Sequence, residues 1–317
     1  MVFEPYMKVL VTGGAGFVGS HLVDALVLRG DEVVVIDHYK REKLRFENPS
    51  AKVYKTSFGH ESVKDIFLEE RPDVVVHLAA QISVTASITD PIGDAETNII
   101  ESLRLLRTAE ASSCKRFVFI SSGGAIYGDH PVRPTPLLED PYPLSPYGVA
   151  KFSFEHYLAG SSSRSVMKTM TLRLANVYGP RQQLKSTGEG NVMAVFLARM
   201  ISGDPVVIFG DGSATRDCVY VRDVVDAIFA AIDSEKEGVV NIGTGIGTSV
   251  REIYNTIMEI HGEEHPFLCE PFRKGEVFHS VIDPSTGSNT LSWKANVKFR
   301  DGMQEMYEWF MKTFRDR

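Results

Sequence analysis

Tyr147 and Lys151 are two side chains with complementary acid–base chemistry, four residues apart. In a helix this spacing places both on one face, and Pro146 suits a first helical turn, where its missing N–H has no partner to lose. An ammonium close to a phenol favours the phenolate and therefore lowers the phenol's pKa. A tyrosine tuned in this way can serve as a general base. The alternative is a surface tyrosine beside a solvated lysine. The elements that surround the pair in the sequence decide between these two interpretations.

A glycine-rich turn stands near the start of the chain. The apolar run Val9–Val11 is followed by Gly13, Gly16 and Gly19 and then by a helix-like segment, His21–Arg29. Glycine suits a turn with positive φ, a close approach of backbone to a diphosphate, and tight packing of helix on strand. The diphosphate would rest on N–H groups at the positive end of the helix dipole. This order of elements predicts a dinucleotide-binding loop.

The next strand-like run indicates which dinucleotide is bound. Glu32–Ile36 ends at Asp37, roughly 20 residues beyond the glycines, where a carboxylate accepts hydrogen bonds from the adenosine ribose and repels a 2′-phosphate. This favours NAD over NADP, although Lys40 and Arg41 would weaken the discrimination, and an Asp that caps a turn is the alternative. An oxidised nicotinamide near Tyr147 would add positive charge and favour its phenolate further.

Strand-like and helix-like segments alternate through the first half of the chain, without hairpin signals. The further strands are expected at residues 52–55, 73–78, 116–120 and 169–174, and the helices at 62–70, 92–112 and 145–158. This alternation predicts an α/β fold with a Rossmann-type, doubly wound parallel sheet covered by helices on both faces. Ligands of such sheets bind beyond the carboxyl ends of the strands. That rule selects Gly13, Asp37, residues 77–80, Ser121-Ser122 and Asn176.

Beyond residue 174 the sequence is richer in Gly, Pro and polar residues. Helices are expected at 191–201, 219–232, 251–260 and 303–313, and strands at 205–209 and 239–242. We expect residues 7–175, with 217–243 returning to them, to form the NAD-binding domain. Residues 176–216 and 244–317 are expected to form a smaller, interleaved C-terminal substrate-binding domain.

Composition narrows the class of protein. The 317 residues are 43% hydrophobic and 24% charged, with a net charge of −7, which argues against nucleic acids or anionic membranes as partners. No apolar run approaches the ~20 residues needed to cross a bilayer, and residues 1–6, a frayed extension or a cloning remnant, lack the features of a signal peptide. Three scattered cysteines predict neither a disulfide framework nor a metal site and fit a reducing cytoplasm.

Taken together, the motifs resemble those of a known family. They are Thr12-Gly-Gly-Ala-Gly-Phe-Val-Gly19, Asp37, His77-Leu-Ala-Ala-Gln81, Ser121-Ser122, Tyr147-x-x-x-Lys151 and Asn176-Val-Tyr-Gly-Pro-Arg181. They resemble the extended short-chain dehydrogenase/reductases, and within these the UDP-glucose (UDP-galactose) 4-epimerases and related nucleotide-sugar enzymes. The resemblance covers nearly the whole chain from Met7.

The resemblance implies an NAD-dependent 4-epimerase of a UDP-hexose. Tyr147 would remove the proton of the sugar 4-hydroxyl while C4 gives a hydride to NAD, and the 4-keto sugar would turn over before the hydride returns. Lys151 would orient the nicotinamide ribose and hold down the Tyr147 pKa. The resemblance also implies a homodimer built from the helices at 92–112 and 147–158, whose apolar faces are alternatively buried within one chain.

One position departs from the family pattern. Gly123 stands where many epimerases place the serine or threonine that relays the proton, so Ser122 is our candidate, with Ser121 a structural hydroxyl. Gly123-Gly124 also replaces the acidic pair of family 4,6-dehydratases, which argues against dehydration. Decarboxylation of a UDP-glucuronate is likewise unsupported. Epimerisation of a uronic acid sugar and reduction of a 4-keto sugar stay open; a reductase would consume external NADH or NADPH. A regulator that binds NAD without turnover would not need the Tyr147–Lys151 pair.

The resemblance also assigns binding residues. For NAD these are Gly13, Gly16, Phe17, Val18, Asp37, Ser57, Leu78, Ala79, Ala80, Gln81, Asn98, Ser121, Tyr147, Lys151 and Leu174. Gln81 and Asn98 would lie near the nicotinamide half. Near the adenine, Thr56-Ser57-Phe58 replaces the usual pair of an Asp and a hydrophobic residue, which leaves the adenine contact open.

For the nucleotide sugar, the resemblance implies contacts from Ser122, Tyr147, Asn176, Asn191, Val192, Val207, Phe209, Arg216, Arg273, Glu276 and Ser280. Asn176 and the helix start at Asn191-Val192 would receive the diphosphate, and residues 207–209 would read the uracil. Arg216 and Arg273 would clamp the diphosphate as bidentate partners, unless they form surface salt bridges.

Two of these positions bear on the sugar moiety and the ribose. Glu276 stands in place of an Asp that holds the uridine ribose. Ser280 is small at a position where epimerases vary in size, which leaves room for a 2-acetamido group.

Overall fold

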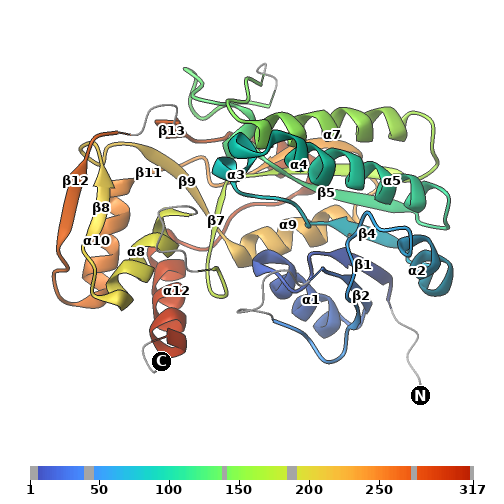
Figure 1. Ribbon diagram of the computed structural model, residues 1–317, viewed down its shortest axis with the longest axis horizontal. Helices are drawn as coiled ribbons and strands as arrows, with labels where there is room; N and C mark the ends of the chain where they lie inside the picture. Colours follow the sequence, from blue (N-terminus) through green and yellow to red (C-terminus); the bar gives the residue numbers. More distant parts are fainter. Residues whose placement is uncertain (1–5, 39–45, 138–140, 184–190, 273–276, 315–317) are drawn as a thin grey trace.

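The β-branched runs predicted as strands form one parallel sheet. The computed structural model describes residues 6–38, 46–137, 141–183, 191–272 and 277–314 (Figure 1). The sheet contains β1 (Lys8–Thr12), β2 (Glu32–Ile36), β3 (Lys52–Tyr54), β4 (Val74–His77), β5 (Arg116–Ser122), β6 (Lys168–Leu174) and β10 (Gly238–Ile242). The predicted α/β, Rossmann-type fold is therefore confirmed.

The strand order explains where ligands bind. It runs β10-β6-β5-β4-β1-β2-β3, and Thr12 at the end of β1 pairs with Ile36 on one side and His77 on the other. From β1 the chain proceeds outwards through β2 and β3, and then crosses back to β4. This reversal between β1 and β4 is the switch point beside which dinucleotides bind in such sheets.

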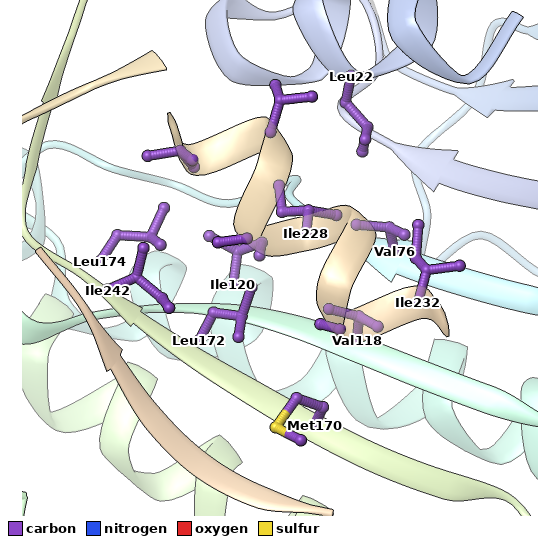
Figure 2. Close-up of a cluster of buried hydrophobic side chains, with 14 of the residues drawn as sticks. Leu22, Val76, Val118, Ile120, Met170, Leu172, Leu174, Ile228, Ile232 and Ile242 are labelled. Carbon is purple, nitrogen blue, oxygen red and sulfur yellow. The ribbon is translucent and has the colours of Figure 1, made fainter. Parts of the chain in front are cut away.

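Both faces of the sheet are covered because its strands are apolar on both sides. On one face α1 (Phe17–Arg29) and α9 (Val221–Asp233) pack on the sheet, and on the other α2 (Val63–Glu70), α5 (Ser102–Glu110) and α7 (Pro146–Ser162) do so (Figure 1). Ile228 and Ile232 of α9 lie against Val76, Val118 and Ile120 of neighbouring strands (Figure 2). Burial of such side chains contributes about 1.5–3 kcal/mol each.

Two predictions of helices need correction. The helix expected at 92–112 is α4 (Pro91–Ala95), a π-helical segment η1 (Glu96–Glu101) and α5, preceded by the unpredicted α3 (Val84–Thr89). The helix expected from Val219 begins at Val221, because Val219 and Tyr220 end the strand β9 (Thr215–Tyr220) and pair with β7 (Asn176–Tyr178). Apolar β-branched runs that pass from strand to helix give no signal at the boundary.

The rest of the chain forms smaller sheets around a separate core. β11 (Gly247–Ser249), β9, β7 and β13 (His279–Ser280) make one sheet, and β8 (Val206–Phe209) pairs with β12 (Phe267–Glu270). A third apolar cluster joins α8 (Val192–Ser202), α10 (Val250–His261) and α12 (Phe299–Phe314). The short helices α6 (Gly123–Ile126) and α11 (Ser285–Leu291) complete the described elements. Within the described ranges no helix has the length and apolarity to cross a membrane.

Candidate active site

The glycine turn after β1 is built from backbone in close contact. Gly13 has a φ of 72° and donates its N–H to the Ile36 carbonyl at 2.9 Å, and Gly16 N–H donates to the Gly13 carbonyl at 3.1 Å. A Cβ at Gly19 would lie 2.1 Å from that same carbonyl oxygen. No side chain caps the start of α1 at Gly16, so backbone N–H groups of the first turn are available to a diphosphate. These residues fit a dinucleotide.

Asp37 lies beside this turn. Its carboxylate accepts a hydrogen bond from Ala15 N–H at 3.2 Å, and its own N–H donates to the Tyr54 carbonyl at 3.1 Å. The carboxyl group is thereby held at the carboxyl edge of the sheet between the glycine turn and β3. Lys40 and Arg41 lie outside the described residues.

His77, at the end of β4, holds the next segment in place. Its Nδ1 is 2.7 Å from Thr12 Oγ1, its Nε2 is 3.0 Å from Ser102 Oγ, and Thr12 Oγ1 also accepts from Ala79 N–H at 3.2 Å. Burial, with the charge of Lys151 as a further cause, lowers the His77 pKa well below its usual value. A neutral, enclosed imidazole fixes residues 78–80 rather than exchanging protons with a ligand.

Asp94, which the sequence analysis did not select, binds two of the predicted residues, Gln81 and Asn98. Its Oδ1 accepts from Gln81 Nε2 at 2.7 Å and from Asn98 Nδ2 at 3.0 Å, while Asn98 exchanges two further hydrogen bonds with the Gln81 backbone. Asp94 and Asn98 are each 2% exposed, and burial raises the Asp94 pKa. The four-residue spacing of Asp94 and Asn98 in one helical stretch was the available signal.

Tyr147, Lys151 and Ser122 come together at the end of β5. Ser145 caps α7 by accepting Gly148 N–H at 3.2 Å, and Pro146 occupies the first turn. The Ser122 side chain lies near the Tyr147 phenol and lowers its pKa, against the larger opposite effect of burial. Lys151 Nζ donates to the Ile120 carbonyl at 2.9 Å and lies 4.7 Å from the centre of the Phe119 ring.

The electrostatics of this group differ from the expectation. Burial raises the pKa of Tyr147 to about 12 and lowers that of Lys151 to about 8. The expectation from the residue types was a lowered Tyr147 pKa. Because the Lys151 ammonium is bound to the Ile120 carbonyl, desolvation of the phenol dominates and Tyr147 holds its proton.

The space beside Gly123 explains why no hydroxyl stands there. A Cβ at Gly123 would lie 3.0 Å from Ile282 Cδ1 and 3.4 Å from the Leu174 carbonyl oxygen. Ile282, 2% exposed, therefore fills the volume that a serine or threonine side chain would need. The hydroxyl that faces Tyr147 comes from Ser122, one residue earlier.

A second group of predicted residues gathers around Gly124. A Cβ at Gly124 would lie 3.5 Å from Ser280 Oγ and 3.9 Å from Asn176 Nδ2, and Ser280 pairs with Arg216 between β13 and β9. Asn176 Nδ2 is buried and has no hydrogen-bond partner among the described residues. A buried amide N–H left unpaired costs free energy, so this atom marks a place for an acceptor such as a phosphate oxygen.

Comparison with known proteins identifies the family. Residues 9–243 match the NAD dependent epimerase/dehydratase family. The chain belongs to this family. It is 36% identical over 310 residues to a UDP-glucose 4-epimerase of Mycolicibacterium smegmatis, which covers 96% of this chain and 98% of that one. A crystal structure of UDP-glucose 4-epimerase from Thermotoga maritima with UDP-glucose has a TM-score of 0.92 and 45% identity, covering 97% and 99% of the two chains.

The family contains several reactions. UDP-glucuronic acid decarboxylase 1 of Arabidopsis thaliana is 30% identical over 98% of this chain and 70% of that protein. The chain is therefore an enzyme of the NAD-dependent nucleotide-sugar epimerase family, with UDP-glucose 4-epimerases among its relatives. Membership of this family does not fix which nucleotide sugar is the substrate, so the sugar must be inferred from the residues of the site.

Several predicted residues of this family have other roles here or lie elsewhere. Asn191 caps α8 by accepting Met193 N–H at 3.0 Å and donates to the Val177 carbonyl at 2.9 Å. Arg216 Nη1 donates to the carbonyls of Thr215 and Phe278 at 2.9 and 3.1 Å. Ser121 Oγ is buried and has no partner within the described ranges. Other predicted residues lie in described elements: Phe17 and Val18 in α1, Leu174 at the end of β6, Val192 at the start of α8, and Val207 and Phe209 in β8. Arg273 and Glu276 fall outside the described residues.

Proposed function

We propose that this protein interconverts UDP-glucose and UDP-galactose by inverting C4 of the hexose. The observation that carries the proposal is the Ser122–Tyr147–Lys151 group at the end of β5, which adjoins the gathering of Gly124, Asn176 and Ser280. A proton-transfer group and a diphosphate-type ligand site thus share the carboxyl edge with the glycine turn. Gly123-Gly124 offers no carboxylate for dehydration at this edge.

NAD, when bound, supplies the acceptor and donor of the C4 hydride. The glycine turn and Asp37 would hold its diphosphate and adenosine ribose, and residues 78–81 and 98 its nicotinamide half. Tyr147 would exchange a proton with the 4-oxygen, and Ser122, whose side chain acts on the pKa of the phenol, would pass that proton. In the complex, the Lys151 ammonium and an oxidised nicotinamide would together supply the positive charge that favours the phenolate.

The nucleotide half would be held by the second group of residues. The unpaired Asn176 amide and the Arg216 guanidinium are hydrogen-bond donors suited to phosphate oxygens. We assign residues 176–216 and 244–317 to this binding function and residues 7–175, with 217–243, to the dinucleotide. Relatives act on or bind UDP-sugars, which supports uridine as the base.

A second substrate class follows from one side chain. Ser280 adjoins Gly124, so two small residues face each other at the sugar side. We infer that UDP-N-acetylhexosamines are accepted as well, because a 2-acetamido group needs space that a bulky side chain at 280 would take.

The test is product analysis without added cofactor. The purified protein is incubated with UDP-galactose and, separately, with UDP-N-acetylgalactosamine, and the nucleotide sugars are separated by chromatography. Appearance of the 4-epimers supports retained NAD and an internal redox cycle. If neither sugar is converted even with NAD added, the assignment falls for these substrates. Conversion that requires a stoichiometric reduced cofactor would indicate a reductase instead.

We also propose a homodimer in a reducing, cytoplasmic compartment. Ile92 of α4, Ile100 of η1 and Tyr157 of α7 are 73%, 45% and 52% exposed, which gives this side of the molecule an apolar face. The three cysteines are free thiols, as expected without an oxidising environment. Sedimentation velocity of the wild type and of Ile92→Glu tests the dimer, and a monomeric wild type would refute it.

A further inference from the structure

Glu101 and Ser57 form a short contact that joins two distant segments. Ser57 follows β3, Glu101 ends η1, and Ser57 Oγ donates to Glu101 Oε2 at 2.6 Å. Both residues are partly buried. The sequence analysis expected Ser57 itself near the adenine and did not select Glu101.

The position of Glu101 is fixed by its neighbours. A Cβ at Gly59 would lie 2.4 Å from Glu101 Cβ and Cγ, so this glycine lies directly against the stem of the glutamate. The next residue, Ser102, is bound to His77 at the end of β4. Phe58, the residue before Gly59, packs on the same histidine: the centres of the Phe58 and His77 rings lie 4.8 Å apart. These contacts therefore hold the Glu101 carboxylate near the carboxyl ends of β3 and β4.

This location lies on the adenosine side of the dinucleotide site. Asp37 follows β2 directly, and β2 is the strand between β1 and β3 in the sheet. A ribose held by Asp37 directs its base towards the loops that follow the neighbouring strands. Ser57 and Glu101 lie in or against the loop after β3, so a base placed there meets them.

The chemistry of the pair fits one edge of adenine. Adenine carries an exocyclic amine, which is a hydrogen-bond donor, and an ionised carboxylate accepts at both of its oxygens. Ser57 engages Oε2 of Glu101, and among the described residues no further partner binds Oε1. A hydroxyl both donates and accepts, so it does not discriminate between a donor and an acceptor on the base. An ionised carboxylate only accepts, so it selects a donor.

We propose that Glu101 selects the base of the cofactor, its carboxylate accepting a hydrogen bond from the exocyclic amine of adenine while Ser57 holds that carboxylate in position. The inference rests on the dinucleotide site proposed above and deepens it. Ser57 is then a positioning residue rather than the group that reads the base.

The test compares NAD with nicotinamide hypoxanthine dinucleotide, which carries a carbonyl oxygen in place of the amine. The purified protein is incubated with an equimolar excess of both until the composition of the bound pool is constant. Bound dinucleotides are then released and quantified by chromatography, which reports relative affinity and not turnover. We expect the wild type to favour NAD by about tenfold or more, as for a hydrogen bond to a charged group.

Glu101→Gln separates selection from packing. The amide keeps the size of the side chain and can accept from Ser57, but it also offers a donor to the hypoxanthine carbonyl. The preference should therefore fall to within about threefold of parity, on the same reasoning. Glu96→Gln, an exposed position at the start of η1, makes the same charge change as a matched control and should keep the wild-type ratio.

Two results would overturn the inference: equal amounts of the two dinucleotides on the wild type, or an unchanged ratio on Glu101→Gln. The wild-type ratio needs no variant and stands even if Glu101→Gln fails to fold. A protein that takes up neither dinucleotide refutes the proposed site itself, whereas equal uptake refutes only the role of Glu101.

Discussion

The two sides of the active site are made in different ways. The part of the proposed cofactor site that would hold the diphosphate is one continuous stretch, Thr12 to Ser20, and its surface is backbone. The proposed sugar side collects Gly124, Asn176, Arg216 and Ser280 from four separate elements, and the groups we expect to bind there are the side chains of the last three.

The difference determines which kind of substitution impairs each side. A site made of closely packed backbone fails when an atom is added, because a new Cβ collides with the turn. A site made of side chains fails when an atom or a charge is removed. Damage to the first should appear as lost cofactor and lost stability, and damage to the second as weaker substrate binding.

The largest effect is expected where the two sides meet. Tyr147→Phe removes the group that exchanges the proton, so kcat should fall by about 10²–10⁴. The phenyl ring keeps the packing of α7, and the amount of NAD retained on purification should not change. Coupled-assay rates and chromatography of released NAD measure the two quantities. More than a tenth of the wild-type kcat would exclude Tyr147 as the principal acid and base.

Gly19→Ala tests the backbone side. The new Cβ would lie 2.1 Å from the Gly13 carbonyl oxygen, so the turn must open, at a cost of about 1–3 kcal/mol in the free energy of unfolding. We expect a lower midpoint in urea and loss of bound NAD. Gly160→Ala is the matched control: within α7 a Cβ there meets nothing nearer than Arg164 Nη2 at 4.0 Å, and alanine should stabilise the helix by about 0.5–1 kcal/mol. Equal destabilisation by both would contradict the packing argument.

Arg216→Gln tests the side-chain side. Loss of a charged donor to a phosphate should raise KM for the UDP-sugar by about tenfold or more, with the amount of retained NAD unchanged. Because Arg216 Nη1 also donates to the carbonyls of Thr215 and Phe278, the free energy of unfolding should fall by about 1–3 kcal/mol as well. Arg222→Gln removes an arginine that pairs with Glu305 at the surface and is 61% exposed in its side chain, where ion pairs contribute little. Its KM should equal that of the wild type. A similar rise in both variants would assign the effect to net charge.

The pH profile sharpens the comparison through Lys151. A lowered lysine pKa, about 8, means that the ammonium is present below that pH and is lost as the pH rises through it. We therefore expect kcat to decline above about pH 8, approaching about tenfold per pH unit. Lys151→Arg keeps a cation throughout this range and should lose the decline whatever its absolute rate. An identical alkaline limb in the variant would point to another group.

Sequence alone predicted the parallel sheet and the glycine turn better than the small sheets beyond residue 175. Valine-rich runs such as residues 74–76 predict buried parallel strands, and glycines at fixed spacing predict the turn. Both signals lie within a few neighbouring residues, so they can be found in the sequence. The strands β7, β9 and β13 were not predicted; two of them have three residues or fewer, and their pairing joins residues far apart in the chain. Ile282 beside Gly123, and Glu101 beside Ser57, likewise join residues that are far apart in the chain, and no periodicity encodes such contacts.

The late strand β10 has a consequence for how the protein is made. It pairs with β6 along Met170–Leu174 and completes the sheet only after β7, α8, β8, β9 and α9 have intervened. During synthesis, the outer edge of β6 keeps its backbone groups open until residue 242 has left the ribosome. A chain truncated before residue 238 would thus expose an unpaired, apolar strand edge, which is a template for aggregation.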